Sequence, residues 1–463
     1  MLSYSYIMLL MIFTVGIFTG IGVLYSKGKI STTDDFLTAR GSTGTKTLSA
    51  TLMASFLGVF LLFTPPEAGI LGGLPAIIGY AMGVASLYGA FIVLSPKVRN
   101  YLPEGSTLTD YAWKRYGKKM YGLTVILSLF YMLVHLVAEL TAIGMVASQL
   151  AGIPLIHTTL LVGFGTMIYT AYGGLRASMF TDLIQMIFVG ILLVGVTAGF
   201  IYYGGGTHTI FTRIGTNTPQ LLSLSNWGGI QYGLTLCIAV FAANLFHQGY
   251  WQRIYAGRNN EILHKSLKSS ILLVVPIMLL TGFLGILAGA FHAGDNPSIA
   301  VFTLASSLFP KAFIIGLFLL ALVLVMSTVD TLLNGIVATF TIDGRRLFKQ
   351  LKEESVLPFA RTITILLMIP AAILAAKGYS VLYLFFVADL VCAGVFFPLF
   401  YGLFSSRCNE KTALWSALLG IGSGIPFFVA GKLLWSFLTP VVVSGGICLL
   451  AVRYQKEKIE TVQ

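Results

Sequence analysis

Long apolar runs of about 20 residues recur along the whole chain and are separated by short polar stretches. An α-helix rises about 1.5 Å per residue, so a run of this length crosses the hydrocarbon core of a bilayer. The pattern predicts thirteen transmembrane helices: 4–26, 47–72, 74–96, 120–150, 157–173, 177–203, 228–247, 268–292, 312–343, 358–376, 379–404, 412–430 and 433–452. Only 10% of the residues are charged, whereas a soluble domain carries about 25%. We therefore expect an all-α, polytopic membrane protein that forms one transmembrane domain over residues 1–463.

Basic residues are divided unequally between the predicted loops. Thirteen helices place the two termini on opposite sides of the membrane. Loops on one side hold 25 of the 29 lysines and arginines, and the other side has only Arg213, Lys311, Lys377 and Lys432. Because positive loops stay in the cytoplasm, we expect an extracellular N-terminus, a cytoplasmic C-terminus and a place in the cell membrane. The excess of basic residues in the cytoplasmic loops then explains the net charge of +12, and no nucleic-acid partner is expected.

Four acidic residues inside predicted helices give the first indication of a functional site. These residues are Glu139, Asp182, Asp330 and Asp389. Ionisable groups at membrane depth are costly, and they commonly line ion or solute pathways. The predicted helices place no lysine or arginine beside these four carboxylates. We therefore expect them to bind cations or protons or to line a wet cavity, and we expect no ion pairs inside the bundle.

The stretch 321–343 combines an apolar helix with a group of small oxygen-bearing side chains. At about 3.6 residues per turn, positions 324, 327, 328 and 331 share one helix face, and Asp330 lies at its edge. Hydroxyl and carboxylate oxygens are hard ligands that suit an alkali cation. The alternative is ordinary helix packing, in which serine and threonine bond to a carbonyl one turn back.

The second predicted helix contains an interruption at Thr64, Pro65 and Pro66. Proline lacks a backbone donor and stops a regular helix, so we interpret these prolines as a helix end at the outer interface. The segment 54–58 lies nearer the middle of the membrane. It is the better candidate for exposed carbonyls, which transporters use to hold ions.

Five short motifs resemble, in order, those of the sodium:solute symporter family. They are DFLTARG (35–41), TLTDY with RYG (107–111, 115–117), GGLRA with Thr181, Asp182 and Gln185 (173–185), Gln252-Arg253 with Ala256, and Met326-Ser327-Thr328. The resemblance implies the five-plus-five inverted repeat of the leucine-transporter-like fold, with repeats at 47–203 and 228–404. One additional helix would lie at 4–26 and two at 412–452. Broken first helices of each repeat would flank a solute site in the middle of the membrane.

The resemblance also implies ion sites between the second and ninth helices. Ligands of the first sodium ion would be the carbonyls of Ala54, Leu57 and Leu324 and the hydroxyls of Ser327 and Thr328. Some members of the family bind a second sodium ion, for which the corresponding residues here are Asp182, Ser327, Asp330 and Thr331. Asp330 departs from the family's hydroxyl at its position and adds a second carboxylate.

The implied function is sodium-coupled symport of a small polar organic solute across the lipid bilayer into the cell, by alternating access. Sodium is the expected coupling ion, and no enzymatic activity is expected. Candidate solute contacts are Ser55, Phe56, Glu139, Asn244, Gln248 and Asp389, with His135 as a possible hydrogen-bonding partner of Glu139. A proton-coupled transporter that titrates Asp330 or Glu139 is the alternative, and a solute-sensing receptor is a further one. Because no buried lysine or arginine is expected, we favour a neutral, zwitterionic or cationic solute. The sequence predicts neither the solute itself nor the oligomeric state.

Overall fold

The computed structural model describes residues 2–30, 32, 36–292, 296–347 and 353–454. Asp35, the first residue of the first motif, lies outside this part of the chain. The described residues form helices, with one isolated bridge between Thr43 and Gly257. The elements are α1 (Tyr4–Ser26), α3 (Thr45–Ala54), η1 (Val59–Leu62), α4 (Thr64–Tyr101), α5 (Leu108–Tyr116), α6 (Lys118–Ala151), α7 (Leu155–Tyr203), α8 (Gly206–Asn217), η2 (Pro219–Leu221), α9 (Trp227–Asn244), α10 (Gln248–Ala256), α11 (Asn260–Ala290), η3 (Pro297–Ile299), α12 (Ala300–Leu308), α13 (Lys311–Leu347), α14 (Glu353–Ala375), α15 (Val381–Ala393), α16 (Phe396–Tyr401), α17 (Glu410–Val429) and α18 (Leu433–Tyr454).

Long apolar helices make up most of the molecule, as the hydropathy pattern predicts. Among the described residues, nine helices are long and apolar enough to cross a membrane, and the bent pair α9 and α10 makes a tenth candidate. Two of the nine, α4 and α7, are broken at Gly73 (φ 65°) and Gly174 (φ 54°). Only glycine adopts such positive φ angles readily. The breaks fall where the sequence predicts divisions between successive helices, and the total of thirteen stays a prediction.

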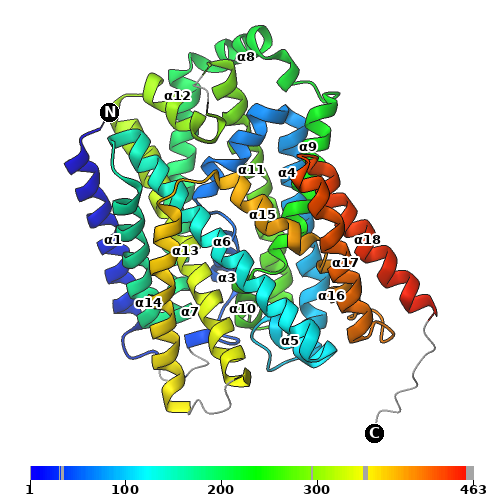
Figure 1. Cartoon of the computed structure of the whole chain (residues 1–463). Coiled ribbons are helices and arrows are strands. Elements are labelled where there is room, and N and C mark those ends of the chain that lie inside the picture. The colour runs from blue at the N-terminus through cyan, green and yellow to red at the C-terminus, as the bar shows by residue number, and fades with distance from the viewer. Residues whose placement is uncertain (1, 31, 33–35, 293–295, 348–352, 455–463) are drawn as a thin grey trace.

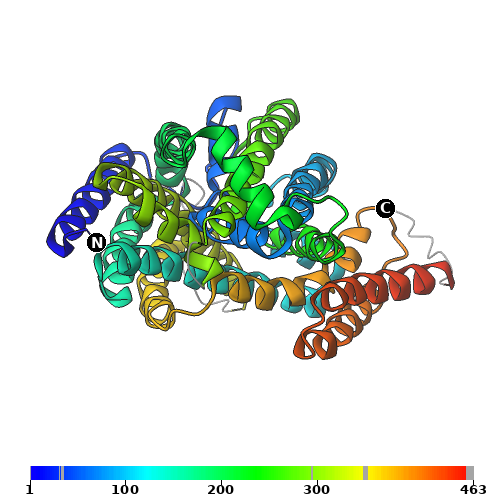
Figure 2. The ribbon, with the colours of Figure 1, turned by 90° about the horizontal axis from the view of Figure 1, so that it is seen from above.

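The helices pack side by side around α13, which is buried along most of its length (Figure 1). Helix α13 contacts α6, α7 and α14. Helix α1 lies at one edge of the bundle against α7, and the pair α17 and α18 lies at the opposite edge (Figures 1 and 2). The short helices α8 and α12 cover the upper end of the bundle in Figure 1, whereas α5 lies at the lower end.

The second predicted helix is built from two helices with an unwound segment between them. Helix α3 ends at Ala54, the 3₁₀ turn η1 follows, and α4 begins at Thr64. Pro65 and Pro66 occupy the first turn of α4, where a missing N–H group costs nothing. The expectation that these prolines end a helix is therefore wrong, because they start one. The interruption lies instead at 55–58, within the segment predicted to expose carbonyls.

The seventh predicted helix is also broken. Helix α9 ends at Asn244, and α10 begins at Gln248 after a bend of 59°. The ring Nδ1 of His247 accepts the N–H of Gly249 (3.1 Å) and caps the start of α10. Phe56 of the first break and Asn244, the last residue of α9, line one buried cavity, which is described below. Two interrupted helices thus meet inside the bundle.

Candidate functional site

The first break releases two backbone carbonyls. In a continuous helix each N–H donates to the carbonyl four residues earlier. Here the N–H of Gly58 donates to the carbonyl of Phe56 (3.0 Å), and that of Leu61 donates to the carbonyl of Gly58 (3.1 Å). The carbonyls of Ala54 and Leu57 therefore lose their usual helical donors. These are the two carbonyls that the family resemblance assigns to the first sodium ion.

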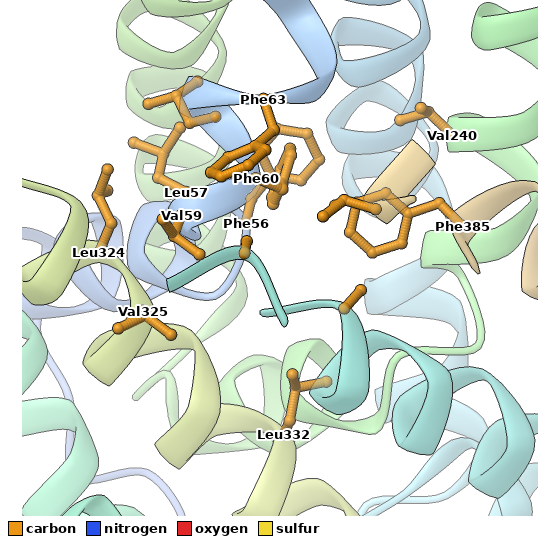
Figure 3. Close-up of a cluster of buried hydrophobic side chains, with 14 of the residues drawn as sticks. Phe56, Leu57, Val59, Phe60, Phe63, Val240, Leu324, Val325, Leu332 and Phe385 are labelled. Carbon is orange, nitrogen blue, oxygen red and sulfur yellow. The ribbon is translucent and has the colours of Figure 1, made fainter. Parts of the chain in front are cut away.

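Helix α13 brings its hydroxyls to this break. The Oγ1 of Thr328 donates to the carbonyl of Ala54 (3.4 Å), and the Oγ of Ser327 donates to the carbonyl of Leu324 (2.9 Å). Figure 3 shows Leu57 and Leu324 on the two facing segments. All five predicted residues are fully buried. Ser327 bonds within its own helix, as the packing alternative predicts, but Thr328 reaches across to a carbonyl that the break has released.

A buried arginine occupies the cluster predicted as a second sodium site. The Arg253 Nη2 lies 2.9 Å from the Oδ2 of Asp182, and it donates to the hydroxyls of Thr331 (2.6 Å) and Ser178 (3.1 Å). The Arg253 Nε donates to the Oγ1 of Thr51 (2.6 Å), which in turn donates to Asp182 (2.5 Å). Arg253 and Asp182 are both fully buried. The guanidinium thus supplies a positive charge to the oxygens that the sequence assigns to sodium.

The expectation of no ion pairs inside the bundle is therefore wrong. The apolar pattern of the seventh predicted helix ends at 247, so the sequence predicts that Arg253 lies in a cytoplasmic loop. In the structure the chain bends after Asn244 and continues as α10, which carries Arg253 into the interior. Hydropathy does not reveal a bend of this kind, because α10 itself is a short helix with a mixed composition.

Asp330 lies in the same cluster but is bound by hydroxyl groups. Its carboxylate accepts from the hydroxyls of Tyr169 (2.7 Å), Ser178 (2.8 Å) and Thr181 (3.3 Å). All three donors come from α7. The structure therefore brings Asp182, Asp330 and Thr331 together as predicted, and protein donors bond to their oxygens except the Oδ1 of Asp182, which has no partner among the described residues.

The cavity between the two breaks contains three of the six predicted solute contacts. Its lining consists of Phe56, Phe60, Tyr80, Tyr131, His135, Leu236, Val240, Asn244, Leu382, Phe385, Phe386 and Asp389. Figure 3 shows the rings of Phe56, Phe60 and Phe385 gathered around this space. The cavity volume is about 20 Å³, which corresponds to roughly one water molecule. Entry of an organic solute therefore requires the surrounding side chains or helices to move.

Ser55 and Gln248 do not line the cavity, although both were predicted as solute contacts. The Ser55 Oγ donates to the carbonyl of Thr51 (2.7 Å) in its own helix. The Gln248 Oε1 accepts the N–H of Leu108 (2.8 Å), and its Nε2 donates to the Oγ of Ser128 (3.0 Å). Gln248 thus fastens α10 to the start of α5 and to α6, which is a structural role.

Glu139 supports the first break and is not part of the cavity lining. Its carboxylate accepts the N–H groups of Val59 (2.8 Å) and Phe60 (3.4 Å), the first residues of η1. A Cβ atom at Gly58 would collide with this carboxylate, so a larger residue there would have to displace the Glu139 side chain. The Nδ1 of His135 has no hydrogen-bond partner among the described residues. The predicted pair of His135 and Glu139 is therefore not formed.

Most of the aromatic lining was not predicted. Its rings come from α4, α6, α15 and the first break, which are far apart in the sequence. One signal was available in α15, where Leu382, Phe385, Phe386 and Asp389 recur at the spacing of one helix face. For Phe60, Tyr80 and Tyr131 the sequence carries no comparable signal.

Comparison with known proteins agrees with this architecture. The model of the sodium:solute symporter family matches residues 36–420. A spermidine transporter of Candida albicans is 27% identical over 82% of this chain and 71% of its own length. A sodium/pantothenate symporter of Escherichia coli is 25% identical over 90% of this chain and 88% of its own length.

The fold is similar to that of a solved transporter. The structure of a Na⁺-coupled sialic acid symporter, in a substrate-bound outward-open state, superposes with a TM-score of 0.79. The match covers 96% of this chain and 97% of the other at 17% sequence identity. These relatives are membrane transporters and not enzymes. On the match over residues 36–420, this chain belongs to the sodium:solute symporter family.

Proposed function

We propose that this protein couples the inward movement of Na⁺ to the import of a small polar organic solute. The observation that carries the proposal is the contact between α13 and the first break. There the Thr328 hydroxyl donates to the freed carbonyl of Ala54 (3.4 Å). The freed carbonyl of Leu57 belongs to the same break, and the Ser327 hydroxyl lies beside Thr328 on α13. Neutral oxygens from carbonyls and hydroxyls suit an alkali cation. None of these groups takes up a proton near neutral pH, which favours sodium over proton coupling.

Alternating access follows from the position of this ion site. A sodium ion bound there ties the first break to α13 and favours the state that receives solute from outside. Release of the ion into the cytoplasm removes the tie. The membrane potential drives each inward charge with about 2.3 kcal/mol per 100 mV. Because coupling between two ligands is reciprocal, bound solute must strengthen sodium binding by the same factor.

The two breaks support an inverted repeat with the predicted bounds, 47–203 and 228–404. The first helix of each proposed repeat is interrupted, at 55–58 and at 245–247. Additional helices at 4–26 and 412–452 would lie outside the repeats. The unequal charge of the loops supports an extracellular N-terminus and a cytoplasmic C-terminus. The cell membrane is the proposed location.

A polar cluster ties α5 to α13 on the side that we assign to the cytoplasm. Arg346 forms ion pairs with Asp110 and Asp343. Asp343 also accepts the hydroxyls of Thr109 and Tyr121, both at 2.9 Å. These bonds hold the inner end of α13 against α5 and α6. We propose that they form part of the inner gate, which must open when solute leaves.

Family membership leaves the solute open. The relatives named above carry spermidine or pantothenate, and the structural neighbour carries sialic acid. The proposal at this level is therefore a small polar organic solute. The cavity beside the two breaks is its proposed binding site.

Sodium-dependent stabilisation of the purified protein tests the ion site. Melting of the wild type in NaCl is compared with melting in equal KCl, because an organic cation used as the control salt could enter the solute cavity. A ligand of the folded state raises stability by about 2.7 kcal/mol at 100 times its Kd. The double variant Ser327→Ala/Thr328→Ala should lose this shift.

The matched control is Thr339→Ala. This buried threonine lies on α13 and bonds to the carbonyl of Gly335 (2.8 Å), away from the site. It should retain the full sodium shift. A double variant that keeps the shift would place the ion elsewhere. If the Tm of the wild type does not change with sodium but changes strongly with pH, the proton-coupled alternative is favoured.

A further inference from the structure

Asp389 differs from the other acidic residues inside the bundle. It lies on α15, is 7% exposed, and lines the cavity. Among the residues that the structure describes, it has no hydrogen-bond or ion-pair partner. By contrast, Asp182 pairs with Arg253, and Glu139 accepts two backbone N–H groups. A carboxylate buried without a partner is costly, so a cation from outside the protein is its natural complement.

Aromatic rings form the rest of the wall around Asp389. Phe56, Phe60 and Phe385 meet edge to face, with ring centroids 5.5 Å apart (Phe56 to Phe60) and 5.6 Å apart (Phe60 to Phe385). Tyr80, Tyr131, Phe386 and the imidazole ring of His135 complete the ring-lined wall. The face of an aromatic ring attracts a cation within about 6 Å of its centroid, above all a weakly hydrated organic ammonium group. The wall therefore suits the same charge that the carboxylate requires.

The lining discriminates against other classes of ligand. A bound Na⁺ needs a shell of several oxygen ligands, whereas this wall consists mostly of carbon. The Tyr80 hydroxyl is already bonded to Thr64 (2.8 Å), and the Asn244 amide donates to the carbonyl of Val240 (2.9 Å). Among the residues that the structure describes, no lysine or arginine lines the cavity. An anionic solute would therefore meet a carboxylate with no compensating positive charge.

From this arrangement we infer that the transported solute is an organic cation whose ammonium group binds Asp389 inside the aromatic wall. The inference rests on the proposed function, because it names the solute class of the same site. Phe56 links the two ligands, since it lies between the carbonyls of Ala54 and Leu57 in the chain and also lines the solute cavity. Sodium binding at those carbonyls therefore positions one ring of the wall.

Ligand-induced stabilisation in the presence and absence of sodium tests this inference. The cationic probes are choline, butylammonium and spermidine. The uncharged counterparts are 3,3-dimethyl-1-butanol, which has the shape of choline without its charge, and 1-butanol. We expect at least one cationic probe to stabilise the wild type in NaCl, with a smaller effect in KCl. The uncharged counterparts should have no effect.

Two variants measure separately how much the carboxylate and the aromatic rings contribute to binding of the cationic probe. Asp389→Asn keeps the shape of the side chain and should weaken binding of the cationic probe about 30-fold or more, because one partner of a buried charge pair is lost. Phe385→Leu should weaken binding by a smaller factor, about threefold to tenfold. The control is Glu67→Gln, which alters a buried carboxylate bonded to Ser298 (2.8 Å) outside the cavity. It should leave binding unchanged.

The outcomes distinguish this inference from sodium coupling. If sodium stabilises the wild type and none of the cationic probes does, the solute class is wrong and the ion site stands. Equal binding of choline and its uncharged counterpart would overturn the role of charge, as would an Asp389→Asn variant with unchanged affinity. Binding of a cation that is lost in Asp389→Asn but independent of sodium would support the solute site and contradict the coupling.

Discussion

Asp182 and Asp389 are both buried carboxylates inside the helical bundle, but their surroundings differ. Asp182 is paired with the Arg253 guanidinium at 2.9 Å and also accepts the Thr51 hydroxyl. Asp389 faces a wall of aromatic rings, and the described part of the chain offers it no bonding partner. The first carboxylate is balanced within the protein. The second is left for a ligand.

This difference shows that burial alone does not identify a binding residue. All four acidic residues predicted from the apolar runs are buried, and three of them have bonding partners within the protein. Their partners are an arginine, backbone N–H groups and hydroxyls. A membrane protein tolerates such groups when their charge or hydrogen-bonding capacity is met. The unsatisfied carboxylate is therefore the one expected to change partners during transport.

Replacing Arg253 should have the largest effect on stability. Arg253→Met leaves Asp182 as a buried charge without its partner, and this loss costs about 3–5 kcal/mol of unfolding free energy. Thermal unfolding in detergent should show a strongly lowered Tm. The pair variant Asp182→Asn/Arg253→Gln should recover a substantial part of the loss, because no uncompensated charge remains. A Tm for Arg253→Met equal to that of the wild type would show that the pair does not hold the cluster together.

Glu139→Gln should have the next largest effect. Its carboxylate accepts two N–H groups at the start of η1, and hydrogen bonds to a charged group contribute about 1.5–3 kcal/mol. Glutamine retains one acceptor oxygen, so we expect a loss of stability in this range together with weaker sodium stabilisation. Glu67→Gln is the comparison, since that carboxylate bonds only to the Ser298 hydroxyl among the contacts described. Equal losses in both variants would argue against a specific role at the break.

Thr331→Ala tests whether the cluster of Arg253 also binds sodium. The variant removes the hydroxyl that accepts from Arg253 Nη2 at 2.6 Å, which should cost about 1 kcal/mol of stability. The sodium-dependent shift in Tm should stay as large as in the wild type, because the guanidinium already supplies the positive charge of this cluster. A clearly smaller shift would indicate that a sodium ion uses Thr331 after all.

The sequence predicts the contact between α13 and the first break better than the aromatic cavity, for a physical reason. Ser327 and Thr328 lie in one apolar helix, and the break opposite them falls inside one long apolar run, so both are local features. Their contact is implied by the family resemblance, and the structure brings Thr328 to Ala54. The rings of the cavity come from separate helices, and only packing brings Phe60, Tyr131 and Phe385 together.

Arg253 is a residue whose position the sequence predicts wrongly. A charged residue beyond the end of an apolar run is normally placed in a loop. Its burial depends on the bend of 59° between α9 and α10, and on acceptors from α3, α7 and α13. None of these is visible in the local sequence around Arg253. Predictions for interrupted helices therefore need the polar residues that follow the break as well as the apolar run before it.

Ser55→Ala should have the smallest effect on stability and on solute affinity. It tests whether the proposed solute site extends to α3. The Ser55 hydroxyl bonds to the carbonyl of Thr51 in its own helix (2.7 Å), and such a local bond is worth about 0.5 kcal/mol or less because it competes with the backbone. The Tm and the affinity for a transported cation should stay close to those of the wild type. Phe56→Leu, one residue further on, should weaken that affinity, because its ring lines the cavity. A larger loss of affinity in Ser55→Ala than in Phe56→Leu would move the solute toward α3 and away from Asp389.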